Sequence, residues 1–276
     1  MKATATTERH PTPILPLAPP EDGVPVAFLL SNGAVMIDFS GPWEVFQDAD
    51  VPGRVKPAFN LYTVAESAKP VLTSGGATLV PHFTLENAPA PKVVVVPAQS
   101  DPTVAVMQWL RSTSKGADLV MSVCTGALVL AQAGLLDGRR VTTHHSAFTT
   151  IAMRYPNVTV VRGVRFVDDV RVATSAGLSA GIDLALHVVA RYYGERTARL
   201  TAYDMEYQSA SWLDANNAGY RRPPVASVGD AICAVCWMEI PKQSALVLSY
   251  RGAKYYFCMP AHERLFESAP QRFINA

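Results

Sequence analysis

A single cysteine stands where a predicted strand gives way to a predicted helix. Cys124 follows an apolar run that ends at Met121, and a helix-forming run begins near Gly126. A side chain on such a turn projects from the sheet, and the helix N-terminus behind it favours negative charge. Because the thiolate is the reactive form of cysteine, this setting predicts a nucleophile at Cys124 that can be a thiolate near neutral pH. The alternative is a buried core cysteine.

A second group of reactive side chains lies near the C-terminus. Cys233 and Cys236 form a C-x2-C motif, and Cys258 and His262 follow as C-x3-H after 21 intervening residues. Three thiols and an imidazole suit tetrahedral Zn²⁺, while thiolates also suit Cu(I). We therefore predict a metal site, with Zn²⁺ as the first candidate and copper as the second. A redox disulfide between Cys233 and Cys236, or a small unit packed without metal, are the alternatives.

Two carboxylates could serve a nucleophile at Cys124. Asp38 follows the first predicted strand and precedes the helix start at Gly41-Pro42. Parallel strands bring such loops to one edge of the sheet, where α/β proteins bind ligands. We predict Asp38 as an acid or base beside Cys124, with a simple helix cap as the alternative. Glu44 either lines the same pocket or faces solvent.

These residues are positioned by alternating strands and helices, which indicate an α/β fold with a mostly parallel sheet. The run of four valines at 93–96 is typical of a central strand buried on both faces. Strands are predicted over residues 24–30, 59–64, 93–96, 118–121, 158–161 and 170–174, paired strands over 71–83, and helices from 41, over 102–112 and over 177–193.

Composition divides the 276 residues into unequal parts. We expect a proline-rich disordered tail over 1–23, a main domain over 24–207, a linker over 208–229 and a small domain over 230–276. The formal net charge of +1 gives no reason to expect bulk binding to nucleic acid. No apolar run reaches the roughly 18–20 residues of a membrane span. Cysteine usage and the lack of a signal-peptide pattern favour a reducing, cytoplasmic setting.

The main domain resembles the DJ-1/PfpI superfamily, and most closely its isonitrile hydratase-like branch. The ligand-binding halves of some AraC-type regulators look similar. The resemblance is carried by residues 36–46, 93–97, 122–127 and 174–183. It implies a flavodoxin-like sandwich of the class I glutamine amidotransferase type, which usually forms a homodimer and needs no cofactor.

The resemblance also implies roles for individual residues. Cys124 would attack the terminal carbon of an isonitrile, a small-molecule substrate, to give a thioimidate that water hydrolyses to an N-substituted formamide. Asp38 would act as acid and base, and Thr125 as a supporting hydrogen-bond donor. A redox, ligand or metal sensor is the non-catalytic alternative, and a glyoxalase or deglycase activity is a further one. No helix-turn-helix pattern follows residue 207, so we expect no direct binding to DNA.

Two segments depart from the family pattern. Ala98 and Gln99 stand where the family usually has two glycines, whose amides contribute to an anion pocket. Ala98 would adopt a positive φ less readily than glycine. His144 matches a family histidine, whereas His145 replaces an aromatic residue. Either histidine could assist proton transfer or be structural.

The C-terminal unit resembles a YHS domain of the TRASH-like, treble-clef group. Residues 250–258 and 266–273 carry this resemblance. Cys233 stands where that family has aspartate, Trp237 replaces a glycine, and His262 replaces the last cysteine. The exchanges at 233 and 262 keep side chains that ligate metals.

Overall fold

A computed structural model describes residues 16–215 and 225–274. Its centre is a seven-stranded sheet in the order β10-β11-β7-β6-β1-β2-β5. The neighbouring strands are parallel except β10, which runs antiparallel to β11 at one edge. The strands are β1 (Val24–Leu29), β2 (Phe59–Ala65), β5 (Phe83–Thr84), β6 (Val93–Val96), β7 (Leu119–Ser122), β10 (Phe166–Asp169) and β11 (Val172–Ser175).

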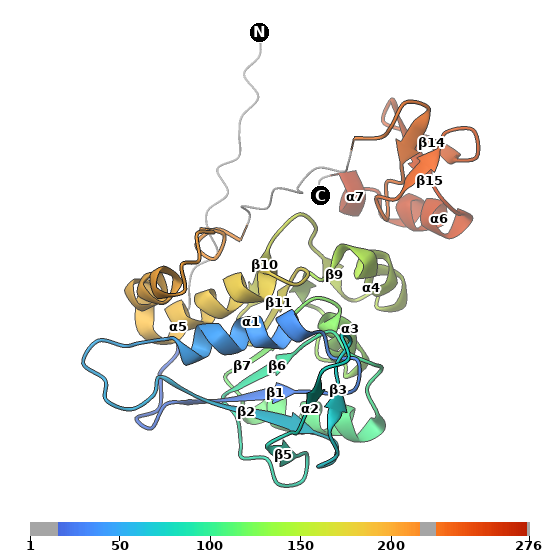
Figure 1. Cartoon of the computed structure of the whole chain (residues 1–276). Helices are drawn as coiled ribbons and strands as arrows, with labels where there is room; N and C mark the ends of the chain where they lie inside the picture. Colours follow the sequence, from blue (N-terminus) through green and yellow to red (C-terminus); the bar gives the residue numbers. More distant parts are fainter. Residues whose placement is uncertain (1–15, 216–224, 275–276) are drawn as a thin grey trace.

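Helices cover both faces of this sheet (Figure 1). Alternating residues of β1 show how: Phe28 joins the core on one face and Leu29 joins the core on the other. Helices α1 (Met36–Gln47) and α5 (Ala180–Asp204) pack on the Phe28 side, and α2 (Val104–Gly116) and α3 (Gly126–Gln132) on the Leu29 side. The result is the predicted α/β sandwich with a mostly parallel sheet.

Shorter elements sit around the sheet. The expected paired strands over 71–83 are a two-stranded hairpin, and the last strand of that region, β5, joins the main sheet. The strand predicted near residue 158 pairs with β8 outside the main sheet, and β10 was not predicted. These elements are β3 (Val71–Leu72), β4 (Thr78–Leu79), β8 (Arg140–Val141), β9 (Thr159–Val160), the 3-10 helix η1 (His145–Ala147) and α4 (Phe148–Arg154).

The first helix begins earlier than predicted. It starts at Met36 rather than near Gly41, because extended Val35 forms its N-cap and Pro42 is accommodated inside the helix. Pro42 has no N–H to bond the carbonyl of Asp38, which costs one helical hydrogen bond. Asp38 therefore lies in the first helical turn and not in a loop.

The main domain extends beyond its predicted ends. The Leu17 amide donates to the Arg191 carbonyl at 2.8 Å, so the last part of the predicted tail is attached to the domain. Trp212, in the predicted linker, is 4% exposed and belongs to the main core. Residues 1–15 and 216–224, the rest of the predicted tail and the centre of the linker, lie outside the described residues.

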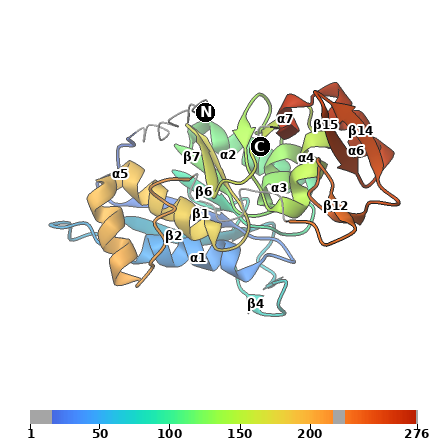
Figure 2. The ribbon, with the colours of Figure 1, turned by 90° about the horizontal axis from the view of Figure 1, so that it is seen from above.

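The C-terminal module forms a small separate core. Phe257 and Phe266 are fully buried in it, with ring centroids 5.2 Å apart. In two perpendicular views the module lies beside α4 of the main domain (Figures 1 and 2). Its elements are β12 (Asp230–Ile232), β13 (Glu239–Pro241), β14 (Leu246–Tyr250), β15 (Ala253–Phe257), α6 (Pro260–Ser268) and α7 (Gln271–Ile274). Among the helices of the described residues, none is both long enough and apolar enough to cross a membrane.

Candidate active site and metal centre

Cys124 sits on a strained turn between β7 and α3. Its φ is 58°, in the left-handed region that a side chain other than glycine rarely adopts. The Cys124 amide donates to the Ala176 carbonyl at 3.1 Å, and the Thr143 hydroxyl donates to the Cys124 carbonyl at 2.8 Å. Bonds on both sides of the residue hold this conformation, which agrees with the predicted sharp turn at the sheet edge.

The turn depends on the glycine two residues later. A Cβ at Gly126 would lie 2.2 Å from the Val96 carbonyl oxygen, a backbone atom of the adjacent strand β6. The chain can therefore pass this close to β6 only without a side chain. The close approach fixes where α3 starts, and with it the direction of the cysteine before it.

Asp38 reaches the same place from α1. Its side chain is fully buried, and its Oδ2 accepts a hydrogen bond from the Ala98 amide at 3.1 Å. Burial raises the pKa of the Asp38 carboxyl to about 6, although the Ala98 amide, the Cys124 thiol and the Leu178 amide oppose the rise. Within the described chain its Oδ1 is buried and makes no hydrogen bond of good geometry. That oxygen remains available for a proton or a ligand.

The thiol and the carboxyl influence each other. Cys124 is 7% exposed, and burial together with the charge of Asp38 raises its pKa to about 11. The amides of Thr125 and Leu178 oppose this rise without cancelling it. The prediction of a resting thiolate near neutral pH is therefore wrong: between about pH 6 and 11 the proton resides on sulfur and the charge on Asp38.

The loop after β6 serves Asp38 rather than an open anion pocket. The Ala98 amide is used by the carboxylate, and Ala98 does not need the positive φ that a glycine would supply. The Gln99 Oε1 accepts from the Ser31 amide at 2.5 Å, which ties this loop to the end of β1. Thr125 acts on Cys124 through its backbone amide, and its side chain does not cap α3.

The two histidines have different positions. His144 lies against the backbone of Gly177, where an added Cβ would be 2.3 Å from its Cδ2. Its Nδ1 is 2.7 Å from the Ser146 hydroxyl, and burial lowers the pKa of the ring. His145 is exposed, with its ring centroid 4.0 Å from that of His144. His144 thus borders the site from one side, and His145 faces solvent.

Glu44 does not belong to this site. Its side chain is exposed, and its Oε2 accepts a hydrogen bond from Gln47 one helical turn further on. The position six residues after Asp38 places it on another side of α1, because six residues correspond to about 1.7 helical turns. Of the two carboxylates predicted, the structure brings only Asp38 to Cys124.

Two contributors to the site were not assigned a role from sequence. Leu178, with a φ of 55°, directs its amide toward both Cys124 and Asp38. Thr143 fixes the carbonyl of Cys124. The residues around Leu178 carry part of the family resemblance. The direction of a backbone amide, however, cannot be read from the type of side chain at that position.

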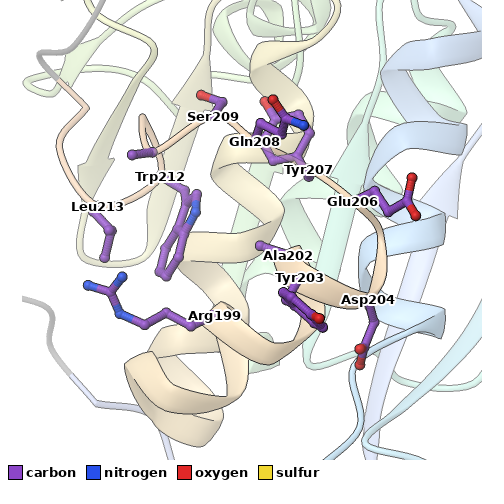
Figure 3. A pocket seen from close by; sticks show the side chains of 11 residues that line it. Arg199, Ala202, Tyr203, Asp204, Glu206, Tyr207, Gln208, Ser209, Trp212 and Leu213 are labelled. Carbon is purple, nitrogen blue, oxygen red and sulfur yellow. The ribbon is translucent and has the colours of Figure 1, made fainter.

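A groove elsewhere on the main domain is formed by the end of α5 and the segment that follows it (Figure 3). Arg199 lies over the ring of Trp212, with 5.7 Å from its guanidinium carbon to the ring centroid. None of the side chains predicted for catalysis or metal binding lines this groove.

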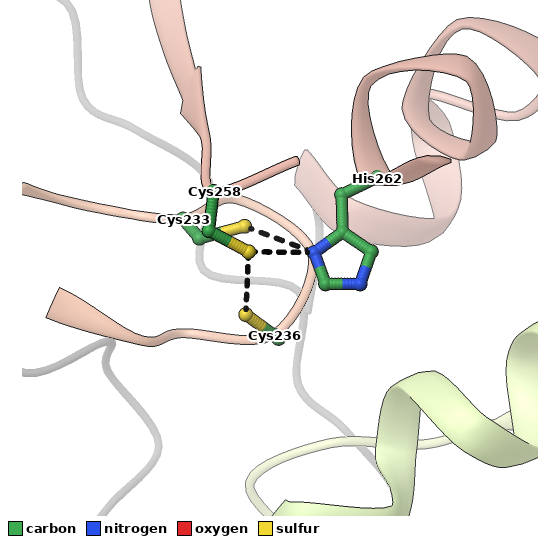
Figure 4. Close-up of side chains that lie close together, drawn as sticks. All are labelled: Cys233, Cys236, Cys258 and His262. Carbon is green, nitrogen blue, oxygen red and sulfur yellow. Dashed lines mark hydrogen bonds between the residues drawn. The ribbon is translucent and has the colours of Figure 1, made fainter. Parts of the chain in front are cut away.

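The four predicted metal ligands converge in the C-terminal module (Figure 4). One ligand atom from each of Cys233, Cys236, Cys258 and His262 lies within 4.8 Å of all the others. The Cys236 and Cys258 sulfurs are 3.7 Å apart, and His262 Nδ1 is 3.0 Å from the Cys258 sulfur and 3.5 Å from the Cys233 sulfur. A tetrahedral ion with bonds of about 2.0–2.3 Å requires separations of this order.

The electrostatics of the cluster also fit a cation. Hydrogen bonds from the Cys236 thiol and from backbone amides lower the pKa of Cys233 to about 4, despite its burial. At least one thiolate is therefore present at neutral pH, as metal ligation requires. The cysteines are free thiols, with no disulfide between Cys233 and Cys236. The donor set fits Zn²⁺ and also Cu(I).

Fold and site together define an α/β sandwich protein with a cysteine on a strand-to-helix turn, paired with a buried carboxylate. The chain matches the DJ-1/PfpI family over residues 24–191 and belongs to that family. It is 33% identical over 200 residues to the isonitrile hydratase of Pseudomonas putida. The aligned region covers 70% of this chain and 82% of that protein.

Other relatives have different descriptions. The HTH-type transcriptional regulator CdhR of Pseudomonas aeruginosa is 34% identical over 162 residues, covering 55% of this chain and 48% of the regulator, so the chain spans about half of that relative. Among solved structures, a THiJ/PfpI family protein from Pseudomonas syringae superposes with a TM-score of 0.61 at 27% identity, covering 68% of this chain and 76% of that one. The family therefore includes both a hydratase and regulators.

Proposed function

We propose that the main domain is a cysteine-dependent hydratase that converts an isonitrile to an N-substituted formamide. The observation that carries the proposal is the thiol of Cys124 beside the carboxylate of Asp38, with one carboxylate oxygen lacking a hydrogen bond of good geometry. The likeness to an isonitrile hydratase over 82% of that protein's length supports the same assignment.

The proton inventory of the pair suits this reaction. Asp38 takes the proton from the thiol as the sulfur bonds to the terminal carbon of the isonitrile, and then gives that proton to the same carbon. The product is a thioimidate. Water next adds to this carbon, while Asp38 transfers one proton of that water to the nitrogen. The tetrahedral adduct then collapses: the formyl C=O forms, the C–S bond breaks, and the hydroxyl proton of the adduct returns to sulfur. Overall, one isonitrile and one water give one N-substituted formamide, and the thiol is regenerated.

The backbone amides around the pair have a defined part in these steps. Those of Thr125 and Leu178 lower the pKa of Cys124, which means that they stabilise the charged sulfur formed when the proton leaves. The Ala98 amide holds the Asp38 carboxylate in place during both transfers.

A second candidate is a sensor whose Cys124 binds a small molecule or is oxidised. The regulators among the relatives favour this alternative. The raised pKa and burial of Cys124 argue against ready oxidation, because peroxide reacts with exposed thiolates. Intact mass after mild peroxide treatment separates the two: a hydratase of the proposed kind keeps an unmodified Cys124, whereas a sensor gains a reversible oxidation there.

For the C-terminal module we propose a bound Zn²⁺ held by Cys233, Cys236, Cys258 and His262, in an accessory role. When bound, the ion would hold together a module whose own core is small. Elemental analysis of protein purified without added metal tests this. One equivalent of zinc per chain supports the proposal. One equivalent of copper would show that the site binds copper instead of zinc.

We also propose that the protein acts as a homodimer on a small molecule in the cytoplasm, without binding DNA. Exposed apolar side chains on Met36, Ile37 and Leu178 flank the residues of the site and would be covered by a second copy. Light scattering coupled to size exclusion measures the mass, and a monomer at micromolar concentration contradicts this arrangement.

The hydratase assignment is tested by parallel incubation with a simple alkyl isonitrile and with methylglyoxal, followed by mass spectrometry. Formamide from the isonitrile alone supports the proposal. Turnover of methylglyoxal alone would instead indicate a glyoxalase.

A further inference from the structure

An arginine of the main domain is enclosed by aromatic rings from both parts of the chain. Arg162 is 6% exposed, and its guanidinium carbon lies 5.3 Å from the ring centroid of Phe148 in α4. The same carbon lies 5.6 Å from the centroid of Trp237 and 5.2 Å from that of Phe273, which belong to the C-terminal module. Phe148 and Trp237 also meet edge to face at 6.4 Å. The C-terminal module thus contacts a docking face formed by Phe148 and Arg162.

The module's side of this contact is tied to the metal ligands. Trp237 directly follows Cys236, and its amide donates to the Cys233 carbonyl at 2.9 Å, closing the turn that carries both cysteines. Its φ of 63° is a conformation that the turn imposes on a bulky residue. An ion bound by Cys233 and Cys236 would hold this turn, and the position of Trp237 follows from the turn.

The main domain's side of the contact leads toward the active site. Phe148 begins α4, directly after η1, whose N-cap is His144. His144 lies against Gly177, and the next residue, Leu178, presents its amide to Cys124 and Asp38. Five short steps of chain and contact therefore connect Trp237 to Cys124 and Asp38.

We propose that the Phe148–Arg162 face is a docking surface for the metal-loaded form of the C-terminal module, and that loss of the metal releases the module from it. The bistable element is the module itself, docked or released, as coupling between distant sites requires. Contact between a cation and aromatic rings stabilises most when the rings enclose the cation and exclude water. Once Trp237 is no longer held by its turn, the enclosure opens and the start of α4 loses its cover.

Hydrogen exchange of the full chain, followed by mass spectrometry with and without a zinc chelator, tests the proposal. We expect metal removal to abolish protection in the module and also to raise exchange in peptides covering 145–154. Peptides covering α2, which has no part in this contact, should not change. Unchanged exchange over 145–154 when the module has lost its protection would overturn the proposal.

A pair of variants separates docking from metal binding. Trp237→Ala should keep its metal yet show the raised exchange over 145–154, whereas Met238→Ala, at the exposed neighbouring residue, should match the parent protein in both. If Trp237→Ala retains metal and shows parental exchange over 145–154, the contact does not dock the module. If it loses the metal, the chelator comparison alone decides.

Only the effect on turnover rests on the proposed hydratase activity. If the protein hydrates isonitriles, undocking should change kcat or KM in Trp237→Ala but not in Met238→Ala. Exchange is measured without substrate, so failure of the hydratase assignment leaves the docking result intact. Equal exchange in loaded and metal-free protein rejects docking whatever the activity.

Discussion

The thiol of Cys124 and the carboxyl of Asp38 share one buried site, and burial raises both of their pKa values, to about 11 and about 6. At neutral pH the pair holds one proton, located on sulfur, and one charge, located on the carboxylate. A buried base that lies beside the proton it must accept is the arrangement that general base catalysis requires.

The pH dependence of the reaction follows from the lower pKa of Asp38 and the higher pKa of Cys124. Asp38 must be ionised to accept the thiol proton, so kcat/KM should be constant near neutral pH and fall about tenfold for each pH unit below about 6. No loss is expected between pH 7 and 9, because the thiol keeps its proton. Steady-state rates across pH 4.5–9 measure the profile. A rise in rate toward high pH would indicate that an ionised Cys124 attacks instead.

Asp38→Asn should reduce turnover by at least about a hundredfold, since it removes a proton carrier. The same variant should stabilise the fold at pH 8. Burial raises the folded-state pKa of Asp38 to about 6, so the cost of its charge grows between about pH 4 and 6 and amounts to about 1–3 kcal/mol above pH 6. Below about pH 4 both states are protonated and the difference should vanish.

Chemical denaturation at pH 8 and pH 4 measures this difference. Glu44→Gln is the matched control, because it neutralises an exposed carboxylate of the same helix. Its stability should change by less than about 0.5 kcal/mol and its turnover should stay parental. Loss of activity in this control would show that α1 tolerates no change of charge, and the interpretation of Asp38 would fail with it.

Gly126→Ala should destabilise the main domain by about 2–4 kcal/mol, because its Cβ would meet the Val96 carbonyl oxygen at 2.2 Å. Gly116→Ala provides the comparison. That position, at the end of α2, has no atom within 4 Å of an added Cβ and should be neutral or slightly stabilising. Thermal unfolding of the two variants ranks them, and equal melting temperatures would contradict the close approach.

Metal content should depend on the C-terminal cluster of three cysteines and His262, and not on Cys124. Cys258→Ala removes one of four ligands whose atoms lie within 4.8 Å of one another, and it should lose most of the bound metal. Cys124→Ala should retain the full equivalent. Elemental analysis of both proteins measures this, and metal loss from Cys124→Ala would place a metal in the main domain.

Much of the site could be predicted because side-chain type and spacing carry it. Small residues around Cys124 predict a turn, and the paired motifs at Cys233 and His262 predict a cluster that the structure brings together. The run of valines over 93–96 predicts a central strand, and β6 is one. In each case the local pattern and the overall fold agree.

The rest depended on three-dimensional contacts. The protonation of Cys124 is set by burial and by Asp38, which is 86 residues away in sequence. The Leu178 N–H belongs to the backbone, and the identity of the leucine side chain does not predict where that N–H points. Arg162 lies among the rings of Phe148, Trp237 and Phe273, which come from three separate segments of the chain, so this contact could not be predicted from sequence. The sequence predicts too late a start for α1 because proline favours the first turn of a helix, whereas this helix accommodates Pro42 in its interior.

The most direct test of the central claim is formation of formamide from a simple alkyl isonitrile by the parent protein, Cys124→Ala, Asp38→Asn and Glu44→Gln, measured side by side at pH 7.5. The account predicts turnover in the parent and in Glu44→Gln, and its loss in the other two. Formamide production by folded Cys124→Ala at the parental rate, or none by the folded parent, would contradict it.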